Sequence, residues 1–248
     1  MQSGRSSSAW FPSLHQRRSG ALHGGDYQRL HCFPIMTTTN TPTSTPAPTN
    51  HFDASARQWD QRPMSQQLAS VPKHLLAQVP FAADDHVLDF GAGTGILSTA
   101  IAPKVAHVTA LDTSAEMLQV LHEKGFANIT TRQQDIFAGL PQRYHAVVSC
   151  MALHHVADTG ALMQAFAGAL HPGGRMALVD LYAEDGSFHG GTEESAAKGV
   201  QHFGFAPEAL QALAEQAGFA DIAFSPIQEM QHRNGRAYPL FLMTGRKP

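Results

Sequence analysis

From His51 onwards, short apolar runs alternate with amphipathic stretches in a regular order. Runs such as HVTALD and YHAVVSCMAL are rich in β-branched and aromatic residues, which is typical of strands. The pattern predicts five strands that alternate with helices, followed by two strands joined by a short connection. The expected strands cover 86–90, 107–112, 128–135, 144–153, 175–182, 221–227 and 237–245.

The stretches between these runs have apolar residues at helical spacing. In 114–125, for example, Ser114 can cap the start of a helix, and Gly125 can end it. Residues 52–79 also show this spacing, but Pro63 and Pro72 interrupt it, so two short helices are expected there. The other expected helices cover 96–102, 161–170 and 207–219.

This order indicates a single α/β domain over residues 51–248. The predicted architecture is a doubly wound, Rossmann-like sheet of seven strands with helices on both faces. The sheet is expected to be mostly parallel, with a C-terminal antiparallel hairpin.

Residues 1–50 have a different composition. The segment TTTNTPTSTPAPTN is rich in Thr and Pro, and we expect the whole extension to be disordered. Residues 1–35 contain four arginines and one acid, Asp26, as in an organelle transit peptide. Two alternatives stay open: Met36 is the true start, or the segment is an ordinary disordered tail.

Composition narrows the function. The 248 residues are 43% hydrophobic and 15% charged, with a net charge of −3, so nucleic acid is not an expected partner. Cys32 and Cys150 match no zinc or disulfide spacing, which favours a reducing compartment, here the cytoplasm. The 15 histidines show no metal-binding spacing, and no apolar run reaches the roughly 20 residues of a membrane span.

A glycine-rich loop, VLDFGAGTG, follows the first strand. Glycine allows a sharp turn and lets a ligand approach the main chain closely. Dinucleotide-binding enzymes use the spacing GxGxxG, whereas here the spacing is GxGxG, with Ile96 at the place of the last glycine. An NAD(P)-dependent oxidoreductase is therefore an alternative that the spacing disfavours.

The segment DFGAGTG resembles the first motif of the class I S-adenosylmethionine-dependent methyltransferases, an acid followed by GxGxG. A carboxylate at Asp89 suits the ammonium group of this cofactor and would repel a pyrophosphate. Asp112 ends the second strand, where an acid that bonds ribose hydroxyls is expected. The segments QDI, SCMALHHV and LHPGG match later family motifs in order.

The resemblance implies S-adenosylmethionine as the cofactor and a small molecule as the methyl acceptor. It also implies that the N-terminal helices, 51–80, form a lid and that the insert 182–206 helps to bind the acceptor. The implied cofactor-binding residues are Trp59, Asp89, Gly91, Ala92, Gly93, Gly95, Asp112, Thr113, Met117, Asp135, Ile136 and Cys150.

Methyl transfer by in-line displacement depends mainly on alignment, and a base is needed only if the acceptor must lose a proton. His154 and His155 are the candidate bases, with His189 and His202 as further candidates. Each of these histidines could instead be structural. A protein that binds the cofactor without turnover, as a sensor or assembly partner, is the alternative function.

Overall fold

The computed structural model describes residues 51–248, so the expectations for residues 1–50 lie outside the described residues. A seven-stranded sheet forms the centre of this part of the chain, in the order β3-β2-β1-β4-β5-β7-β6. The strands are β1 (His86–Phe90), β2 (His107–Asp112), β3 (Ile129–Gln133), β4 (Tyr144–Cys150), β5 (Leu170–Leu181), β6 (Ala220–Gln231) and β7 (Ala237–Arg246).

Strands β1 to β5 pair in parallel, and β7 pairs antiparallel with both β5 and β6. The strand order reverses between β1 and β4, and such a switch point is where open α/β sheets bind ligands. This arrangement confirms the predicted seven-stranded, doubly wound fold with its C-terminal antiparallel hairpin.

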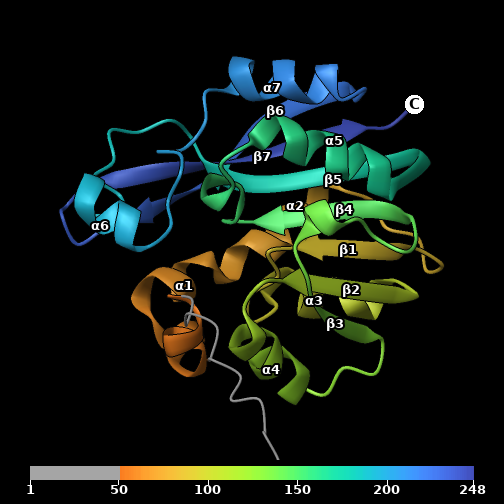
Figure 1. Cartoon of the computed structure of the whole chain (residues 1–248), viewed down its shortest axis with the longest axis horizontal. Coiled ribbons are helices and arrows are strands. Elements are labelled where there is room, and N and C mark those ends of the chain that lie inside the picture. The colour runs from red at the N-terminus through yellow and green to blue at the C-terminus, as the bar shows by residue number, and fades with distance from the viewer. Residues whose placement is uncertain (1–50) are drawn as a thin grey trace, which may run out of the picture. The chain divides into compact units, whose positions relative to one another are not determined.

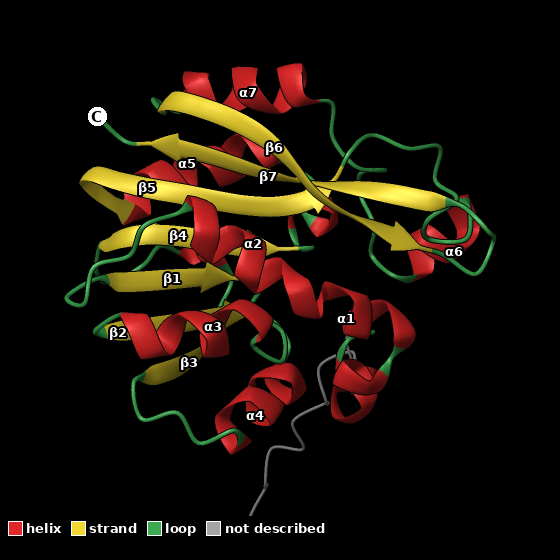
Figure 2. Cartoon of the chain, turned by 180° about the vertical axis from the view of Figure 1, so that it is seen from behind, coloured by secondary structure: helices red, strands yellow, loops and turns green. Residues whose placement is uncertain are grey.

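Helices cover both faces of the sheet, as Figures 1 and 2 show from opposite sides. Along each central strand, alternate side chains enter different cores. The helices are α1 (Pro63–Gln67), α2 (Val71–Gln78), α3 (Ile96–Ile101), α4 (Ala115–Glu123), α5 (Thr159–Ala169), α6 (Thr192–Ala197) and α7 (Pro207–Gln216). Val87 of β1 packs with α2 and α3, whereas Leu88 packs with α5 and α7. Across 51–248 none of these helices combines the length and apolarity needed to span a bilayer.

The N-terminal segment contains more helical pieces than the two expected. It consists of the 3-10 helices η1 (Asp53–Gln61) and η2 (Leu68–Ser70) together with α1 and α2. Pro63 and Pro72 were expected to break helices, but each lies in the first turn of one. The first turn tolerates proline because its backbone N–H groups have no partner within the helix.

The clearest differences from the expected boundaries concern β4, β5 and the insert. Strand β4 ends at Cys150, and the 3-10 helix η5 (Leu153–His155) follows it. The expected turn HPGG instead falls within β5, where the register with β4 shifts between Tyr144 and Ala146. The insert contains α6, a short helix bounded by glycines that gave little sequence signal.

Candidate cofactor and acceptor site

A cavity of about 820 Å³ lies at the carboxyl ends of the central strands, beneath the N-terminal helices. It is at the upper end of the range typical of ligand pockets, about 300–1,000 Å³. Of the expected cofactor residues, all except Asp89 and Gly95 line it. Of the two candidate bases, His155 lines the cavity and His154 does not.

The glycine loop forms one wall of the cavity. Gly91, Gly93 and Gly95 all have positive φ, which L side chains rarely adopt. A Cβ atom at Gly91 would collide with Ala152, and one at Gly95 would collide with Leu121. A Cβ atom at Gly93 would meet no protein atom within 4 Å. The loop therefore leaves open space above Gly93, which fits a ligand that approaches the backbone closely.

Asp112, at the end of β2, fixes this loop from the side. Its carboxylate accepts hydrogen bonds from the backbone N–H groups of Gly93, at 2.7 Å, and Ser114, at 2.8 Å. Burial raises its pKa, and these backbone bonds act in the opposite direction. Each carboxylate oxygen retains a lone pair, so Asp112 can also accept hydrogen bonds from ribose hydroxyls in the cavity.

Asp89 lies below the loop and does not line the cavity, so its placement does not match the expected direct contact with an ammonium group. It is 1% exposed, and its Oδ2 accepts bonds from the backbone N–H and the hydroxyl of Ser98, at 2.9 and 2.6 Å. Burial raises its pKa to about 7, and the two bonds from Ser98 oppose this shift. Asp89 thus holds the first turn of α3 beneath the loop.

Residues after β3 form the opposite end of the cavity. Asp135 accepts a bond from the backbone N–H of Phe137, at 2.9 Å, and Ile136 is buried. Phe137 also lines the cavity, although its side chain is half exposed. No motif in the sequence singled out Phe137. Its position directly after the acid–apolar pair was the available signal.

The N-terminal helices are tied to the glycine loop and to the end of α4. Asp60 of η1 accepts hydrogen bonds from the Thr94 hydroxyl and from Lys124 Nζ, the latter at 2.8 Å. Lys124 also bonds the Thr94 carbonyl at 2.7 Å. Trp59 lies beside this network, with the Arg62 guanidinium over its ring. Asp60 and Lys124 line the cavity and were missed because they are far apart in the sequence.

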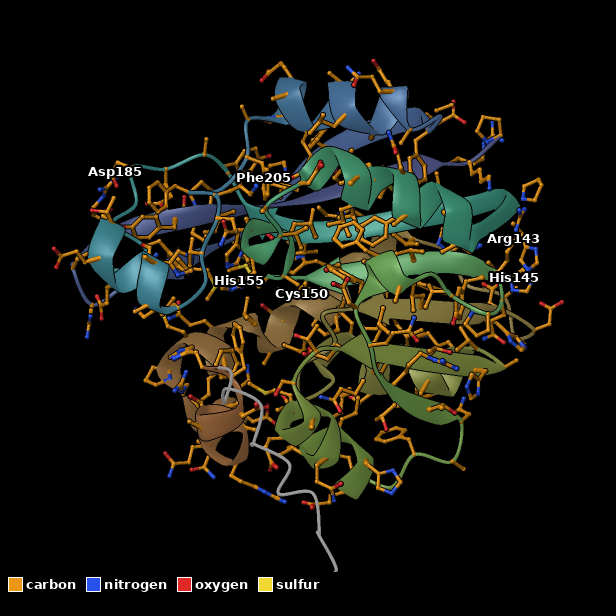
Figure 3. The ribbon with its side chains drawn as sticks, viewed as in Figure 1. Arg143, His145, Cys150, His155, Asp185 and Phe205 are labelled. Carbon is orange, nitrogen blue, oxygen red and sulfur yellow. The ribbon has the colours of Figure 1, made fainter. Side chains whose placement is uncertain are left out.

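His155 is the histidine that lines the cavity, and Cys150, also labelled in Figure 3, lines it too. Its Nδ1 lies 3.1 Å from the Gly199 carbonyl, which can only accept, so Nδ1 carries the hydrogen. In the neutral ring, Nε2 therefore has the free lone pair. Burial lowers the pKa of His155 to about 4, with a further contribution from His154. The Phe52 ring packs edge-on against it.

His154 is buried directly beside the cavity wall and pairs with Asp180 at the end of β5. Its Nδ1 donates to Asp180 Oδ1 at 2.7 Å, and the two side chains are 2% and 0% exposed. Its carbonyl accepts bonds from the backbone N–H groups of Gln201 and His202 in the insert. Asp180 was missed by the sequence analysis, because a single acid within an apolar strand gives no distinct motif.

The other two candidate bases do not line the cavity. His202 Nε2 lies 2.9 Å from the Val156 carbonyl, so this side chain joins the insert to the segment after β4. The His189 ring packs 4.9 Å from that of His154, and burial lowers its pKa to about 3. Within 51–248, no group of three or more His, Cys, Asp or Glu side chains is arranged to hold a metal ion.

Comparison with known proteins agrees with this geometry. A family model described as a methyltransferase domain matches residues 57–223. The chain is 28% identical over 152 residues to an uncharacterized methyltransferase of Schizosaccharomyces pombe, covering 54% of this chain and 53% of that protein. It is 38% identical over 96 residues to a ubiquinone biosynthesis O-methyltransferase of Xylella fastidiosa, covering 36% and 39%. The matches thus span about half or less of these relatives.

Solved structures share the fold. A chain from the complex of the Haloferax volcanii Trm112 methyltransferase activator with a methyltransferase superposes with a TM-score of 0.68 at 21% identity, covering 80% of this chain and 98% of that one. Phosphoethanolamine N-methyltransferase 2 of Haemonchus contortus, bound to S-adenosyl-L-methionine, gives 0.60 at 16%, covering 79% and 60%. Family model, strand order and glycine loop agree: the chain belongs to the class I S-adenosylmethionine-dependent methyltransferase family.

Proposed function

We propose that this protein transfers the methyl group of S-adenosylmethionine to a small-molecule acceptor by in-line displacement. The observation that carries the proposal is the hydrogen bond from the Gly93 backbone N–H to the Asp112 carboxylate. The carboxylate holds the backbone at the one loop glycine above which the cavity is open.

The lining residues fit the cofactor part by part. Asp112 is placed to bond the ribose hydroxyls, and Asp135 with Ile136 and Phe137 to hold the adenine. The backbone of Gly91 to Gly93 would lie along the amino-acid part. When bound, the cofactor supplies a methyl group activated by a positively charged sulfur. Asp89 contributes indirectly, by fixing the start of α3.

The protein's contribution to the reaction is mainly alignment. Correct positioning of two reactants can lower a barrier by several kcal/mol, up to about 7–11. The N-terminal helices act as a lid, because Asp60 connects η1 to both Thr94 and Lys124 at the cavity. His155 then faces the acceptor with a neutral ring, and His154 lies behind it as a positioning residue rather than as the base.

Relatives carry names that agree with a small acceptor, in one case an O-methyltransferase of ubiquinone biosynthesis and in another a phosphoethanolamine N-methyltransferase. Those names describe the relatives' own substrates. The proposal for this chain is limited to a small molecule that fits beside the cofactor in the cavity.

Two measurements test the proposal. Calorimetry with S-adenosylhomocysteine should show binding in the micromolar range, and no binding at high micromolar ligand would contradict it. Incubation with methyl-labelled cofactor and a fractionated metabolite extract should label a small compound. Label that appears only on protein or nucleic acid would reject the small-molecule acceptor while leaving cofactor binding intact.

A further inference from the structure

The cavity has an uneven distribution of charge. Within 51–248, the Asp, Glu, Lys and Arg side chains that line it are Asp60, Asp112, Lys124 and Asp135. Two of these, Asp60 and Lys124, pair with each other. The other two lie at the ends of β2 and β3, on the side assigned above to the ribose and adenine. All four charged side chains of the lining are therefore assigned, two to the lid contact and two to the nucleoside.

The remaining lining residues are uncharged when the His155 ring is neutral. One wall comes from the lid, and the other from the start of α3 and the segment after β4. Met151, Leu68 and Ile96 pack against the same core cluster, so their part of the wall is apolar. These walls also contain the polar but uncharged side chains of Ser65, Gln66 and Thr99.

Two titratable side chains in this part are held in their neutral forms. Burial raises the pKa of the Cys150 thiol, and the nearby Asp180 and Asp89 raise it further. Burial also lowers the pKa of His155 to about 4. A thiol and an imidazole respond to burial in opposite directions, yet both are shifted away from their charged states. Burial is the largest cause of both shifts, so a charged group at this end of the cavity would lose hydration.

His155 adds one directional contact. Because Nδ1 donates to the Gly199 carbonyl, Nε2 can accept a single hydrogen bond. His155 can thus accept a hydrogen bond inside the cavity. The molecule that receives the methyl group therefore needs an O–H or N–H group to donate it.

We propose that the methyl acceptor is an uncharged, largely apolar molecule that presents one hydroxyl or amine hydrogen to His155. This inference rests on the proposed function and narrows its substrate class. Carboxylated or phosphorylated molecules are excluded, because an ion buried without a partner loses far more hydration energy than the cavity returns.

The transfer step balances with these groups. A lone pair of the acceptor oxygen or nitrogen forms the bond to the methyl carbon while the carbon–sulfur bond breaks and its electron pair stays on sulfur. The acceptor atom becomes strongly acidic as it gains the methyl group. Its proton passes to His155 Nε2 and then to solvent, so even a weakly basic imidazole suffices.

The test uses the complex of the full chain with S-adenosylhomocysteine and three probes that all carry a free hydroxyl on a naphthalene ring: 2-naphthol, 6-hydroxy-2-naphthoate and 6-hydroxy-2-naphthyl phosphate. Binding is measured by calorimetry, and methyl transfer with labelled cofactor. We expect 2-naphthol to bind at least tenfold more tightly than either charged probe and to be the one that is methylated. Equal or tighter binding of a charged probe, or no binding of 2-naphthol, would overturn the inference.

A variant shows whether charge is the cause. Gln66 lines the lid wall, so Gln66→Arg should improve binding of 6-hydroxy-2-naphthoate relative to binding of 2-naphthol at least fivefold. Gln164→Arg, on the exposed side of α5, is the matched control and should change neither. No gain in Gln66→Arg would contradict the proposed cause.

Cofactor binding separates this inference from the function on which it rests. If S-adenosylhomocysteine does not bind, the methyltransferase proposal fails. If S-adenosylhomocysteine binds but a charged probe binds as tightly as 2-naphthol or more tightly, only the proposed substrate class is wrong.

Discussion

The Nδ1 of His154 donates to Asp180 Oδ1 at 2.7 Å, and the two side chains are almost wholly buried between the ends of β4 and β5. The same carboxylate accepts from the backbone N–H groups of Leu181, at 2.8 Å, and of His154, at 3.3 Å. The Asp180 carboxylate thus accepts three hydrogen bonds, and it fixes the segment from which His155 reaches the cavity.

Asp180→Asn should lower the free energy of unfolding by about 1–3 kcal/mol. The new amide N–H₂ would face an N–H donor, because both carboxylate oxygens accept in the native protein. Urea unfolding measures the loss, and Asp185→Asn, at an exposed pair with Arg236, should cost much less. In ¹⁵N spectra of the histidines, the Nδ1–H form of His154 should be perturbed in the first variant alone. Equal losses would show that the buried pair has no special role.

Gly93→Ala should weaken S-adenosylhomocysteine binding at least tenfold, because the added methyl group projects into the cavity. Gly125→Ala is a matched control, since its φ of 75° is also positive and a Cβ atom there also meets no protein atom within 4 Å. Both variants should lose about 1 kcal/mol of folding stability. Calorimetry in which the two lose affinity equally would place the cofactor elsewhere.

Asp112→Ala should weaken cofactor binding by about 1–3 kcal/mol through lost charge-assisted hydrogen bonds. Asp112→Asn should weaken it less, because an amide oxygen can still accept one bond. Calorimetry with S-adenosylhomocysteine measures both. Wild-type affinity in Asp112→Ala would show that the ribose is held by other groups.

Asp60→Ala should speed the dissociation of S-adenosylhomocysteine severalfold, because the lid loses its contacts with Thr94 and Lys124. The change in stability should stay below about 1 kcal/mol, as is usual for an exposed pair. Arg57→Ala is the control: it breaks an exposed ion pair between the same two helices, with Glu123, but does not line the cavity. Stopped-flow displacement gives the rates, and equal rates in the two variants would argue against a lid.

Stability should fall on acidification below pH 6.5, in part through His155. Its folded pKa of about 4 lies below the ordinary 6.5, so between these values the unfolded chain binds more protons than the native one. This contributes a loss of up to about 1.4 kcal/mol per pH unit. His155→Phe should flatten the slope, and His122→Phe, at an exposed site, should not. Urea unfolding from pH 4.5 to 7 checks this, and parallel slopes in all three proteins would contradict it.

The sequence predicted the features of the fold that depend on residues close together along the chain. Strand and helix order follows from apolar periodicity, and the bend after β1 follows from three glycines within five residues. Asp112 was also within reach, because the length of one β–α–β unit sets its distance from the loop. Helix boundaries were mispredicted at Pro63 and Pro72, because proline can either end a helix or begin one.

What the sequence determined by itself was therefore the fold class, the family and the loop that meets the cofactor, since each rests on local spacing. Only the tertiary structure decided which groups meet across the chain. It paired His154 with Asp180, 26 residues away, and Thr94 with Asp60, 34 residues away. It also shows that Asp89 lies beneath the glycine loop, where it bonds Ser98 of α3, and does not line the cavity. Such contacts depend on how strands and lid pack in space, and burial then sets the charge state of each group.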